Sequence, residues 1–304
     1  MRRVVIFSEN TGWHEQRLLA VLRAQQVDAA VCSLRDCRIG FEAEGNGILI
    51  PGFVNRLPDA AFVRAVPAGG FEEVALRLDI LHALGACGIP VYNPATAIEY
   101  TVDKGMTSFL LLRAGIPTPR TWVCESREVA EEVIRSEAAA NRQVVLKPLF
   151  GNCGRGLLLL DDPGQLPSRE EVNGVYYLQG YLRQGRGNGR DWRVFVINGR
   201  AVAAMERVSG HWISNRARGG KCLPAVLTDP LRAIAEPAVI ATGACYAGVD
   251  VIIDEKGDYA VLEVNGIPAW RGLQSVCPGN IAELLANDFL LRLSAGGESS
   301  ATAV

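Results

Sequence analysis

The chain has 304 residues and a formal net charge of −2, with 49% hydrophobic and 21% charged residues. This length predicts more than one compact unit, and the composition excludes a disordered chain, a collagen-like repeat and a coiled coil. A protein that binds nucleic acid along its phosphate backbone usually carries a basic excess, so the charge argues against that role. No apolar run reaches the ~18 residues of a membrane span, so we expect neither nucleic acid nor a membrane as a partner.

The cysteines and the N-terminal residues indicate a reducing, intracellular setting. The eight cysteines include no Cys-x-x-Cys pair, and with only three histidines they argue against a structural zinc site or a disulfide scaffold. The first apolar run is short and is soon interrupted by Asn10 and His14, which is typical of a first strand and not of a signal peptide. We therefore expect a cytoplasmic protein.

The first third of the chain alternates strands and helices. Apolar runs predict buried strands at 3–7, 28–33, 61–64 and 91–93. Helical periodicity predicts helices at 13–25 and 71–84. The stretch 40–59 is rich in glycine and proline and is expected to be irregular. A β-α-β beginning of this kind favours a parallel sheet.

From residue 103 onward the pattern mixes helices with antiparallel hairpins. Helices are predicted at 103–114, 127–139, 230–243 and 279–294. Strands are predicted at 120–124, 143–148, 157–160, 175–182, 191–197, 200–207, 247–254 and 258–265. Asn198-Gly199 is a strong two-residue hairpin turn, and 208–222 is polar and loop-like. The fold class predicted from these patterns is mixed α/β.

A lysine at the end of a predicted strand is followed by a glycine-rich turn, Lys147-Pro148-Leu149-Phe150-Gly151-Asn152-Cys153-Gly154-Arg155-Gly156. Glycines let backbone N–H groups approach phosphate oxygens, and a lysine supplies a compact positive charge. The lysine precedes the glycines, which excludes a Walker loop, and a strand follows, which excludes a dinucleotide-binding fingerprint. The alternative is a glycine-rich hairpin with an ordinary lysine at its base.

Two carboxylates lie on consecutive strands that a short turn joins. This arrangement brings Asp250 close to Glu263 across an antiparallel ladder, and Asn265 follows on the same strand as Glu263. A carboxylate in such an apolar strand is costly unless it is paired or binds a metal. Two carboxylates and an amide oxygen are hard ligands that suit Mg²⁺. The alternative is that one carboxylate pairs with an arginine.

Two further segments carry groups that could contact an anion. With the turn at Asn198-Gly199, Arg193 lies opposite residues 204–206, so that Arg193 and Arg207 converge at one end of the sheet. Arginines there would stabilise charge on a group in transfer, unless they are ordinary exposed side chains. The loop 214–220 offers amide, guanidinium and backbone donors, and its alternative is a plain surface loop.

Taken in this order, the segments resemble the ATP-grasp ligases, and within them the RimK type, which adds amino acids to a carboxylate. The resemblance runs from about Ala61 to Leu290 and includes Thr101-Val102-Asp103-Lys104 and Glu263-Val264-Asn265. It implies an ATP-grasp fold in which two α+β lobes sandwich ATP. The implied parts are an N-terminal β-α-β lobe (1–98), a central lobe with a glycine-rich lid (99–180), a C-terminal lobe with the metal site (181–295) and a flexible tail (296–304).

The resemblance implies a role for each matching residue. The expected ATP-binding residues are Lys104, Lys147, Gly151, Gly154, Gly156, Gln179, Gly180, Tyr181, Leu182, Asp191, Ser214 and Asn215. Two Mg²⁺ ions, or Mn²⁺, would be held by Asp250, Glu263 and Asn265. The expected catalytic residues, facing the γ-phosphate and an acyl phosphate, are Arg193, Arg207 and Asn215. The expected substrate residues are Arg64, Arg218, Gly219 and Arg271.

The activity that the resemblance implies is amide-bond formation between a carboxylate and an amine. Transfer of the γ-phosphoryl group of ATP to the carboxylate makes an acyl phosphate, which the amine attacks as phosphate leaves. The expected substrates are a small carboxylate acceptor and L-glutamate, and the segment 71–126 resembles ligases associated with tetrahydromethanopterin. The alternatives are a glutamate ligase that modifies a protein or peptide C-terminus and a non-catalytic nucleotide-binding protein. A homo-oligomer is the family expectation.

Overall fold

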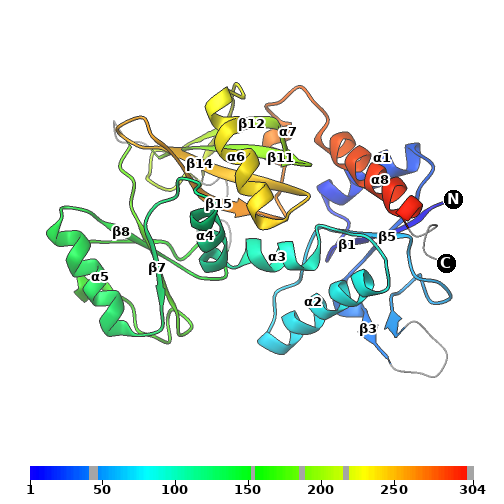
Figure 1. Cartoon of the computed structure of the whole chain (residues 1–304), viewed down its shortest axis with the longest axis horizontal. Helices are drawn as coiled ribbons and strands as arrows, with labels where there is room; N and C mark the ends of the chain where they lie inside the picture. Colours follow the sequence, from blue (N-terminus) through cyan, green and yellow to red (C-terminus); the bar gives the residue numbers. More distant parts are fainter. Residues whose placement is uncertain (41–46, 152–154, 185–188, 215–218, 300–304) are drawn as a thin grey trace.

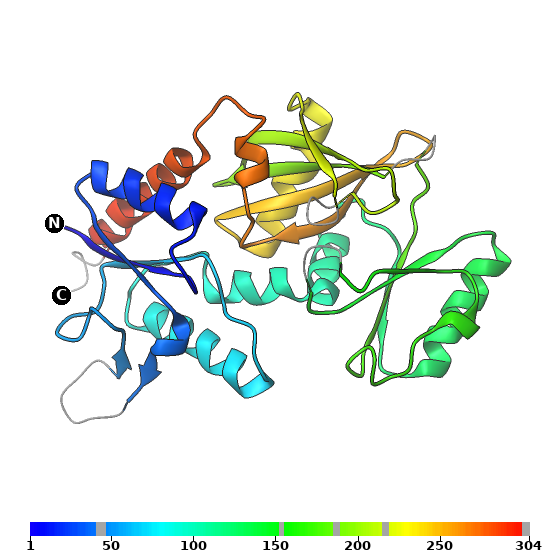
Figure 2. The ribbon, with the colours of Figure 1, turned by 180° about the vertical axis from the view of Figure 1, so that it is seen from behind.

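Three lobes follow one another along the chain, and each is built on its own β-sheet (Figure 1). The computed structural model describes residues 1–40, 47–151, 155–184, 189–214 and 219–299. In Figures 1 and 2 the N-terminal and central lobes lie at opposite ends, and the C-terminal lobe lies between them along one side. The mixed α/β class predicted from the sequence is confirmed.

The N-terminal lobe holds a parallel sheet with the strand order β2-β1-β5-β6. Its strands are β1 (Arg3–Phe7), β2 (Asp28–Cys32), β5 (Ala60–Val63) and β6 (Val91–Tyr92), and its helices are α1 (Trp13–Ala24) and α2 (Phe71–Ala86). Val4 and Ile6 pack on the side of α1, whereas Val5 and Phe7 pack on the side of α2. A helix on each face explains why these strands are apolar throughout. The stretch 40–59, expected to be irregular, contains β4 (Ile48–Leu49), which pairs with β3 (Arg38–Ile39).

The central lobe is an antiparallel sheet in the order β7-β10-β8-β9, covered on one face by α5 (Arg127–Ala139). Its strands are β7 (Thr121–Cys124), β8 (Val144–Lys147), β9 (Leu158–Leu160) and β10 (Tyr176–Gly180). Val144 and Leu146 of β8 pack in the core under α5. Because side chains alternate along a strand, Val145 and Lys147 are directed to the opposite face. That uncovered face forms one wall of the candidate site.

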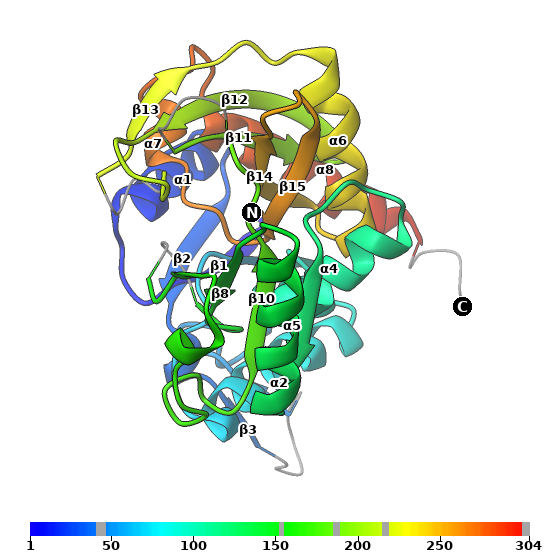
Figure 3. The same cartoon turned by 90° about the vertical axis from the view of Figure 1, so that its left-hand side faces the viewer.

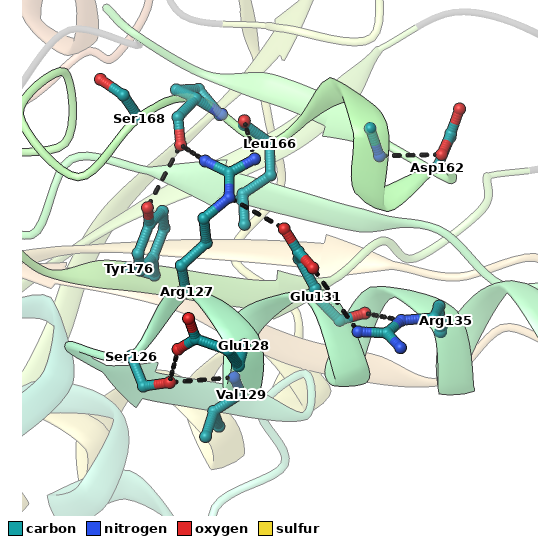
Figure 4. Close-up of polar contacts among 12 residues, drawn as sticks. Ser126, Arg127, Glu128, Val129, Glu131, Arg135, Asp162, Leu166, Ser168 and Tyr176 are labelled. Atoms are coloured by element: carbon teal, nitrogen blue, oxygen red, sulfur yellow. Dashed lines mark hydrogen bonds and ion pairs between the residues drawn. The ribbon is translucent and has the colours of Figure 1, made fainter.

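A network at the start of α5 ties this helix to the segment that leads into β10 (Figure 4). Arg127 donates from Nε to Glu131 at 2.8 Å, and from Nη1 and Nη2 to the carbonyl oxygens of Pro167 and Leu166 at 2.8 and 3.0 Å. The hydroxyl group of Tyr176 donates to the same Pro167 carbonyl at 3.2 Å. One guanidinium therefore joins the helix, the connecting segment and the first residue of β10.

The C-terminal lobe is a five-stranded antiparallel sheet in the order β13-β12-β11-β14-β15. Its strands are β11 (Arg190–Ile197), β12 (Arg200–Val208), β13 (Lys221–Pro224), β14 (Tyr246–Ile253) and β15 (Tyr259–Asn265), and α6 (Asp229–Thr242) covers one face. The register pairs Asp250 with Glu263 and Arg193 with Met205. Both pairings were predicted from the spacing of the hairpins, and both are confirmed.

Helices connect the lobes in ways that the sequence did not indicate. α3 (Ala95–Val102) and α4 (Lys104–Arg113) follow the N-terminal sheet, and Leu111 of α4 enters the core of the C-terminal lobe. The last helix, α8 (Ile281–Ser299), packs against α1, and its Leu285 and Phe289 join the core of the N-terminal lobe (Figure 1). The helix predicted to end the C-terminal lobe thus covers the first lobe. It also continues to Ser299, into the segment 296–304 expected as a tail.

Several short elements were not predicted; besides β3 and β4 they include α3, α7 (Arg271–Gln274) and β13. β13 begins at the end of the stretch 208–222 that we expected to be a loop, and it forms by pairing with the edge of β12. Elements this short take their conformation from tertiary partners and not from their own periodicity. Among the described residues, no helix is both long and apolar enough to cross a membrane.

Candidate active site

A pocket opens between the uncovered face of the central sheet and the C-terminal sheet, which lie one above the other in Figure 3. Val145 and Lys147 of β8 form one wall, and Asp250 and Ile252 of β14 with Glu263 of β15 form the other. The predicted site residues that line it are Lys104, Lys147, Gly151, Gln179, Gly180, Tyr181, Leu182, Asp191, Arg207, Ser214, Asp250 and Glu263. Residues from both sheets of the predicted ATP sandwich therefore converge on one cavity.

Two lysines enter this pocket from different elements. Lys104 is the first residue of α4, and its Nζ donates to the carbonyl oxygen of Gly151 at 2.7 Å. Lys147 ends β8, and its Nζ donates to Oε1 of Gln179. Burial lowers the pKa of both amino groups, that of Lys147 to about 8, although the charge of Glu263 opposes the shift. A phosphate group in the pocket would favour the charged form of both lysines.

Asp250 lies at the centre of a buried cluster of charges. Arg193 donates from Nη2 to Oδ2 of Asp250 at 2.8 Å and from Nε to the other oxygen. Nη2 of Arg207 lies 2.8 Å from the same Oδ2, and Nε of Arg207 donates to Asp191. Asp191 also accepts a hydrogen bond from the hydroxyl group of Ser214. Two guanidinium groups and two carboxylates therefore neutralise one another inside the sheet.

The pKa values of this cluster follow from burial and from the ion pairs. Burial disfavours ionisation of Asp250, but the charges of Arg193 and Arg207 outweigh it and hold the pKa of Asp250 at about 2. Burial dominates at Asp191 and raises the pKa of that carboxyl group. The predicted convergence of the two arginines is confirmed by these contacts. The pairing of Asp250 with arginine is also the arrangement that the sequence left open as the alternative to metal binding.

Glu263 lies opposite Asp250 on the ladder but has a different environment. Within the described residues, its carboxylate makes no side-chain hydrogen bond and no ion pair within 4.0 Å. Its charge nevertheless acts on Lys104 and Lys147 and opposes the lowering of their pKa values. Oδ1 of Asn265 accepts a hydrogen bond from the backbone N–H of Ile267 at 3.0 Å. Glu263 is thus a carboxylate that faces the pocket and is available to a ligand.

The donor set at this end of the pocket fits magnesium. No three histidine, cysteine, aspartate or glutamate side chains cluster around a common point in the part of the chain that the structure describes. An ion beside Glu263 would therefore have few protein ligands, namely the carboxylates of Glu263 and Asp250 and the amide oxygen of Asn265. Mg²⁺ prefers hard oxygen ligands and usually keeps several waters or phosphate oxygens, so this set suits an ion that arrives with a nucleotide.

Apolar side chains complete the pocket, and these were not predicted. They are Val145, Leu157, Trp212, Ile213, Ile252 and Leu262. A signal for two of them was present in the sequence, because Val145 and Ile252 lie two residues from Lys147 and Asp250 on their strands and so share a face with them. Gly180 and Tyr181 are held by backbone hydrogen bonds to Arg120 and Gln143, at 2.7 and 2.9 Å. The chain therefore leaves the central lobe along the pocket wall in a fixed position.

The glycine-rich segment is shaped by its contact with Pro148. Gly156 has a φ of +68°, and a Cβ there would lie 2.9 Å from Cγ of Pro148. Both facts require glycine at this position. Gly151 lines the pocket, whereas Gly156 lies beyond it. The predicted site residues Gly154, Asn215 and Arg218 lie outside the described residues.

The remaining predicted residues are not among those that line this pocket. Arg193 and Asn265 neighbour lining residues, since Arg193 bonds to Asp250 and Asn265 lies two residues from Glu263 on β15, and Gly219, with a φ of +92°, is an exposed turn residue. Arg64 is buried where the N-terminal and C-terminal lobes meet, and Arg271 is exposed nearby. The structure therefore separates these two predicted substrate arginines from the predicted nucleotide residues.

The environment of Arg64 and Arg271 is shared with one histidine. Nε2 of His14 accepts hydrogen bonds from the backbone N–H groups of Trp270 and Arg271, at 3.1 and 3.2 Å. Burial lowers the pKa of His14 to about 4, and the charges of Arg64 and Arg271 add to the effect while Glu15 opposes it. The neutral imidazole ring thus joins α1 of the first lobe to α7 of the last.

The sequence matches the RimK-like ATP-grasp domain over residues 101–288. It is 32% identical to the tetrahydromethanopterin:α-L-glutamate ligase of Methanococcus maripaludis over 302 residues, which cover 95% of this chain and 98% of that protein. The enzyme of the same name from Methanosarcina acetivorans is 34% identical over 260 residues, with 75% of this chain and 78% of that protein covered.

Solved structures share the fold. The ATP-grasp ligase PsnB, in complex with its minimal precursor, Mg and ADP, superimposes with a TM-score of 0.71 at 20% sequence identity, and the match covers 96% of this chain and 98% of that one. The same ligase has also been solved with the precursor peptide PsnA2 and AMPPNP. These similarities confirm the ATP-grasp fold predicted from the sequence.

Proposed function

The chain belongs to the RimK-like ATP-grasp family, and from this we propose that it is an ATP-dependent carboxylate–amine ligase that adds L-glutamate to a tetrahydromethanopterin-like pterin. The names of two relatives that are 32% and 34% identical support this choice of substrates. The observation that carries the proposal is the pocket in which Lys104 and Lys147 face Glu263 between two sheets. The expected cellular setting is the cytoplasm.

The two lysines bind the phosphates of ATP. Lys147 is held in place by Gln179, and Lys104 already contacts the backbone of the glycine-rich segment at Gly151. Closure of this segment over the nucleotide would exchange that contact for one with phosphate. The apolar side chains, including Val145 and Ile252, would exclude water from the part of the pocket that receives the adenine ring. Exclusion of water protects an acyl phosphate from hydrolysis.

The acidic end of the pocket would hold the metal ions that accompany ATP. Glu263, Asp250 and Asn265 would be the ligands, and the expected number of ions is two Mg²⁺, with Mn²⁺ as a substitute. When bound, these ions neutralise charge on the phosphates and orient the γ-phosphoryl group. Arg193 and Arg207, anchored by Asp250, keep positive charge fixed beside that group. Preorganised charge of this kind stabilises a transition state without reorganisation.

The reaction requires no covalent intermediate on the protein. The acceptor carboxylate attacks the γ-phosphorus of ATP and becomes an acyl phosphate as ADP leaves. The amine of glutamate then attacks the carbonyl carbon of the acyl phosphate, and the amide forms as phosphate leaves and the nitrogen loses a proton. The side chains of the pocket bind and neutralise charge in both steps. This agrees with the absence of an activated nucleophile such as a Cys–His pair among the described lining residues.

Mass spectrometry of the product tests the proposal. The enzyme is incubated with ATP, Mg²⁺, L-glutamate and tetrahydromethanopterin, and the expected product is heavier than the pterin by one glutamyl residue. Omission of ATP, Mg²⁺ or glutamate should each prevent its formation. Phosphate release that depends on glutamate but not on the pterin would contradict the choice of acceptor.

Modification of a protein or peptide C-terminus is the second candidate. It is favoured by the fold neighbour PsnB, which has been solved with a precursor peptide. Incubation of the enzyme with ATP, glutamate and a mixture of peptides that end in free carboxylates separates the two. Glutamylated peptides in the absence of a modified pterin would establish this second candidate.

A further inference from the structure

A chain of hydrogen bonds leads from Lys147 in the pocket to helix α4. Nζ of Lys147 donates to Oε1 of Gln179, and Nε2 of Gln179 donates to the hydroxyl group of Tyr177 at 3.2 Å. The oxygen of that hydroxyl group lies 2.9 Å from Oγ of Ser108, which belongs to α4. Gln179, Tyr177 and Ser108 are all buried. Three side chains shielded from water therefore connect a pocket lysine to a helix.

The register of the central sheet places Tyr177 on the pocket face without making it a pocket residue. Tyr177 on β10 pairs directly with Lys147 on β8, and paired residues have their side chains on the same face. Gln179 lies two residues further along β10 and shares this face. Lys147 and Gln179 line the pocket, whereas Tyr177 is not among the lining residues. Any effect of Tyr177 on a ligand therefore passes through other side chains.

At its other end the chain reaches the helix that presents the second lysine. Ser108 lies four residues after Lys104 on α4, so both are on the same side of the helix. Burial raises the pKa of Tyr177, and the charges of Glu263 and Asp103 add to this effect, while the hydrogen bond with Ser108 opposes it. The phenol therefore keeps its proton and remains able to donate. The chain joins the strand that carries Lys147 to the helix that carries Lys104.

The charge of Lys147 sets the direction of every bond in the chain. An ammonium group can only donate, so Lys147 requires the oxygen of the Gln179 amide. The amide then presents its N–H to Tyr177, whose hydroxyl group accepts this bond and can donate its own proton to Ser108. The reverse orientation of the amide would bring an N–H group against the ammonium group. The bonds therefore all point away from Lys147, and each one polarises the next.

Tyr177 is the nearer of two acceptors for the Gln179 amide. The other is Oγ1 of Thr121, which lies 3.5 Å from Nε2. Without the hydroxyl group of Tyr177, the amide would keep only this long contact on its nitrogen among the described residues. The hydroxyl group is not needed to fill space, because a phenyl ring would occupy nearly the same volume. Burial of a hydroxyl group is costly unless it is hydrogen-bonded, so its contribution depends on these partners.

We propose that Tyr177 is a positioning residue for the nucleotide: its hydroxyl group holds the Gln179 amide with Oε1 toward Lys147, and thereby fixes the ammonium group where the phosphates bind. Ser108 completes the chain by accepting from Tyr177 and ties it to α4. The proposal rests on the proposed ligase function only in that the pocket binds ATP. Tyr177 does not touch the nucleotide, so its effect depends on the presence of Lys147.

The first test compares the affinity for ATP of two variants that each remove one buried hydroxyl group. Tyr177→Phe should raise the Kd for ATP, measured by calorimetry, about 3–10-fold, the effect of one lost hydrogen bond. The matched control is Tyr176→Phe on the opposite face of β10. The hydroxyl group of Tyr176 donates to the carbonyl oxygen of Pro167, which also accepts from Arg127 (Figure 4). Its Kd should stay within about twofold of the wild type. Equal Kd values for Tyr177→Phe and the wild type would overturn the proposal.

A double-mutant cycle with Lys147→Met separates a positioning role from a structural one. If Tyr177 acts through Lys147, Tyr177→Phe should change the Kd by less than about twofold once Lys147 is replaced. A general disturbance of the sheet would weaken ATP binding by the same factor in both backgrounds, and that result would overturn the proposal. Ser108→Ala should weaken binding in the same direction as Tyr177→Phe but by a smaller factor. It provides the same measurement if Tyr177→Phe does not fold.

The pH dependence of ATP binding gives a readout that packing alone would not change. The chain favours the charged form of Lys147, so its loss should move the pH at which binding weakens from about 8 to a lower value. The expected shift is about 0.5–1 pH unit. The other charged groups that act on Lys147 are Glu263, Lys104 and Asp250, and all three stay in place in Tyr177→Phe. An unchanged midpoint in this variant would contradict the proposed role of the hydroxyl group.

These measurements distinguish failure of the proposal from failure of the proposed function, because ATP binding requires neither glutamate nor the pterin. A Tyr177-dependent Kd together with no glutamylated pterin would contradict the choice of acceptor and support the positioning role. A glutamylated pterin together with the same Kd for Tyr177→Phe and the wild type would support the ligase function and overturn the positioning role.

Discussion

Arg193 and Asp250 are direct cross-strand partners on β11 and β14, and two nitrogens of the guanidinium group bond to both oxygens of the carboxylate. Arg207 joins the same carboxylate from the next strand. Asp250 therefore holds two arginines in place whether or not it also binds a metal. Glu263, its neighbour on the other side, has no such contacts within the described residues. This difference predicts different behaviour for variants of the two acids.

Asp250→Asn and Glu263→Gln should both lower kcat by about 100-fold or more, since each removes a charge from the pocket. Only Asp250→Asn should also destabilise the fold, by about 3–5 kcal/mol, because it leaves buried arginines without their partner. Glu263→Gln should melt within a degree or two of the wild type, roughly the change expected where no contact is lost. Steady-state kinetics and thermal unfolding check both outcomes. Equal destabilisation by the two variants would contradict this reading of the cluster.

The lowered pKa of Lys147 predicts that nucleotide binding depends on pH. Burial lowers its pKa to about 8, so the amino group loses its charge as the pH rises through that value. The Kd for ATP should therefore increase above about pH 8 in the wild type. Lys147→Met should weaken binding at all pH values and remove this dependence. Lys147→Arg keeps the charge but presents a planar fork, so it should bind ATP without the pH effect and less tightly than the wild type at pH 7.

The lowered pKa of His14 predicts that the stability of the fold depends on pH. Its pKa is lowered from 6.5 to about 4 in the folded protein, so the unfolded chain binds the proton more tightly between these values. The free energy of unfolding should therefore rise with pH from about 4 to 6.5 and lose this contribution as the pH falls. His14→Gln, which can still accept from the N–H groups of Trp270 and Arg271, should show a smaller rise. Denaturant unfolding of both proteins across this range measures the difference, and parallel curves would refute the assignment.

The close packing of Arg193 over Gly248 predicts that a side chain at position 248 disturbs the charge cluster. A methyl group there would press on Cδ of Arg193, so Gly248→Ala should shift this side chain away from Asp250. The expected cost is about 1–3 kcal/mol of stability, with a fall in kcat. The matched control is Gly85→Ala in α2, where a Cβ would meet nothing within 4 Å. The control should be neutral or slightly stabilising, because alanine is a better helix former than glycine. Equal effects of the two substitutions would show that Arg193 accommodates the methyl group.

Local patterns in the sequence were sufficient for most of the elements and for much of the pocket. Short apolar runs predicted the strands that carry Lys147, Asp250 and Glu263, because buried strands are rich in apolar and β-branched residues. The turn at Asn198-Gly199 set the register of β11 and β12, so the approach of Arg193 and Arg207 could be predicted. Residues that a hairpin brings together are separated by few positions in the sequence. Their pairing can therefore be counted outward from the turn.

Contacts between distant parts of the chain were decided only by the tertiary structure. The packing of α8 on α1 depends on which apolar faces remain uncovered after the lobes form, and periodicity alone cannot indicate this. The sequence alone does not distinguish the apolar residues that line the pocket, such as Trp212 and Leu262, from the apolar residues of the core. The identity of Asp250 as an arginine partner is likewise a property of the assembled lobes. The sequence determined which chemical groups are present and on which face of each strand they lie, whereas folding determined which charges are neutralised, because ion pairing and burial depend on residues far apart in the chain.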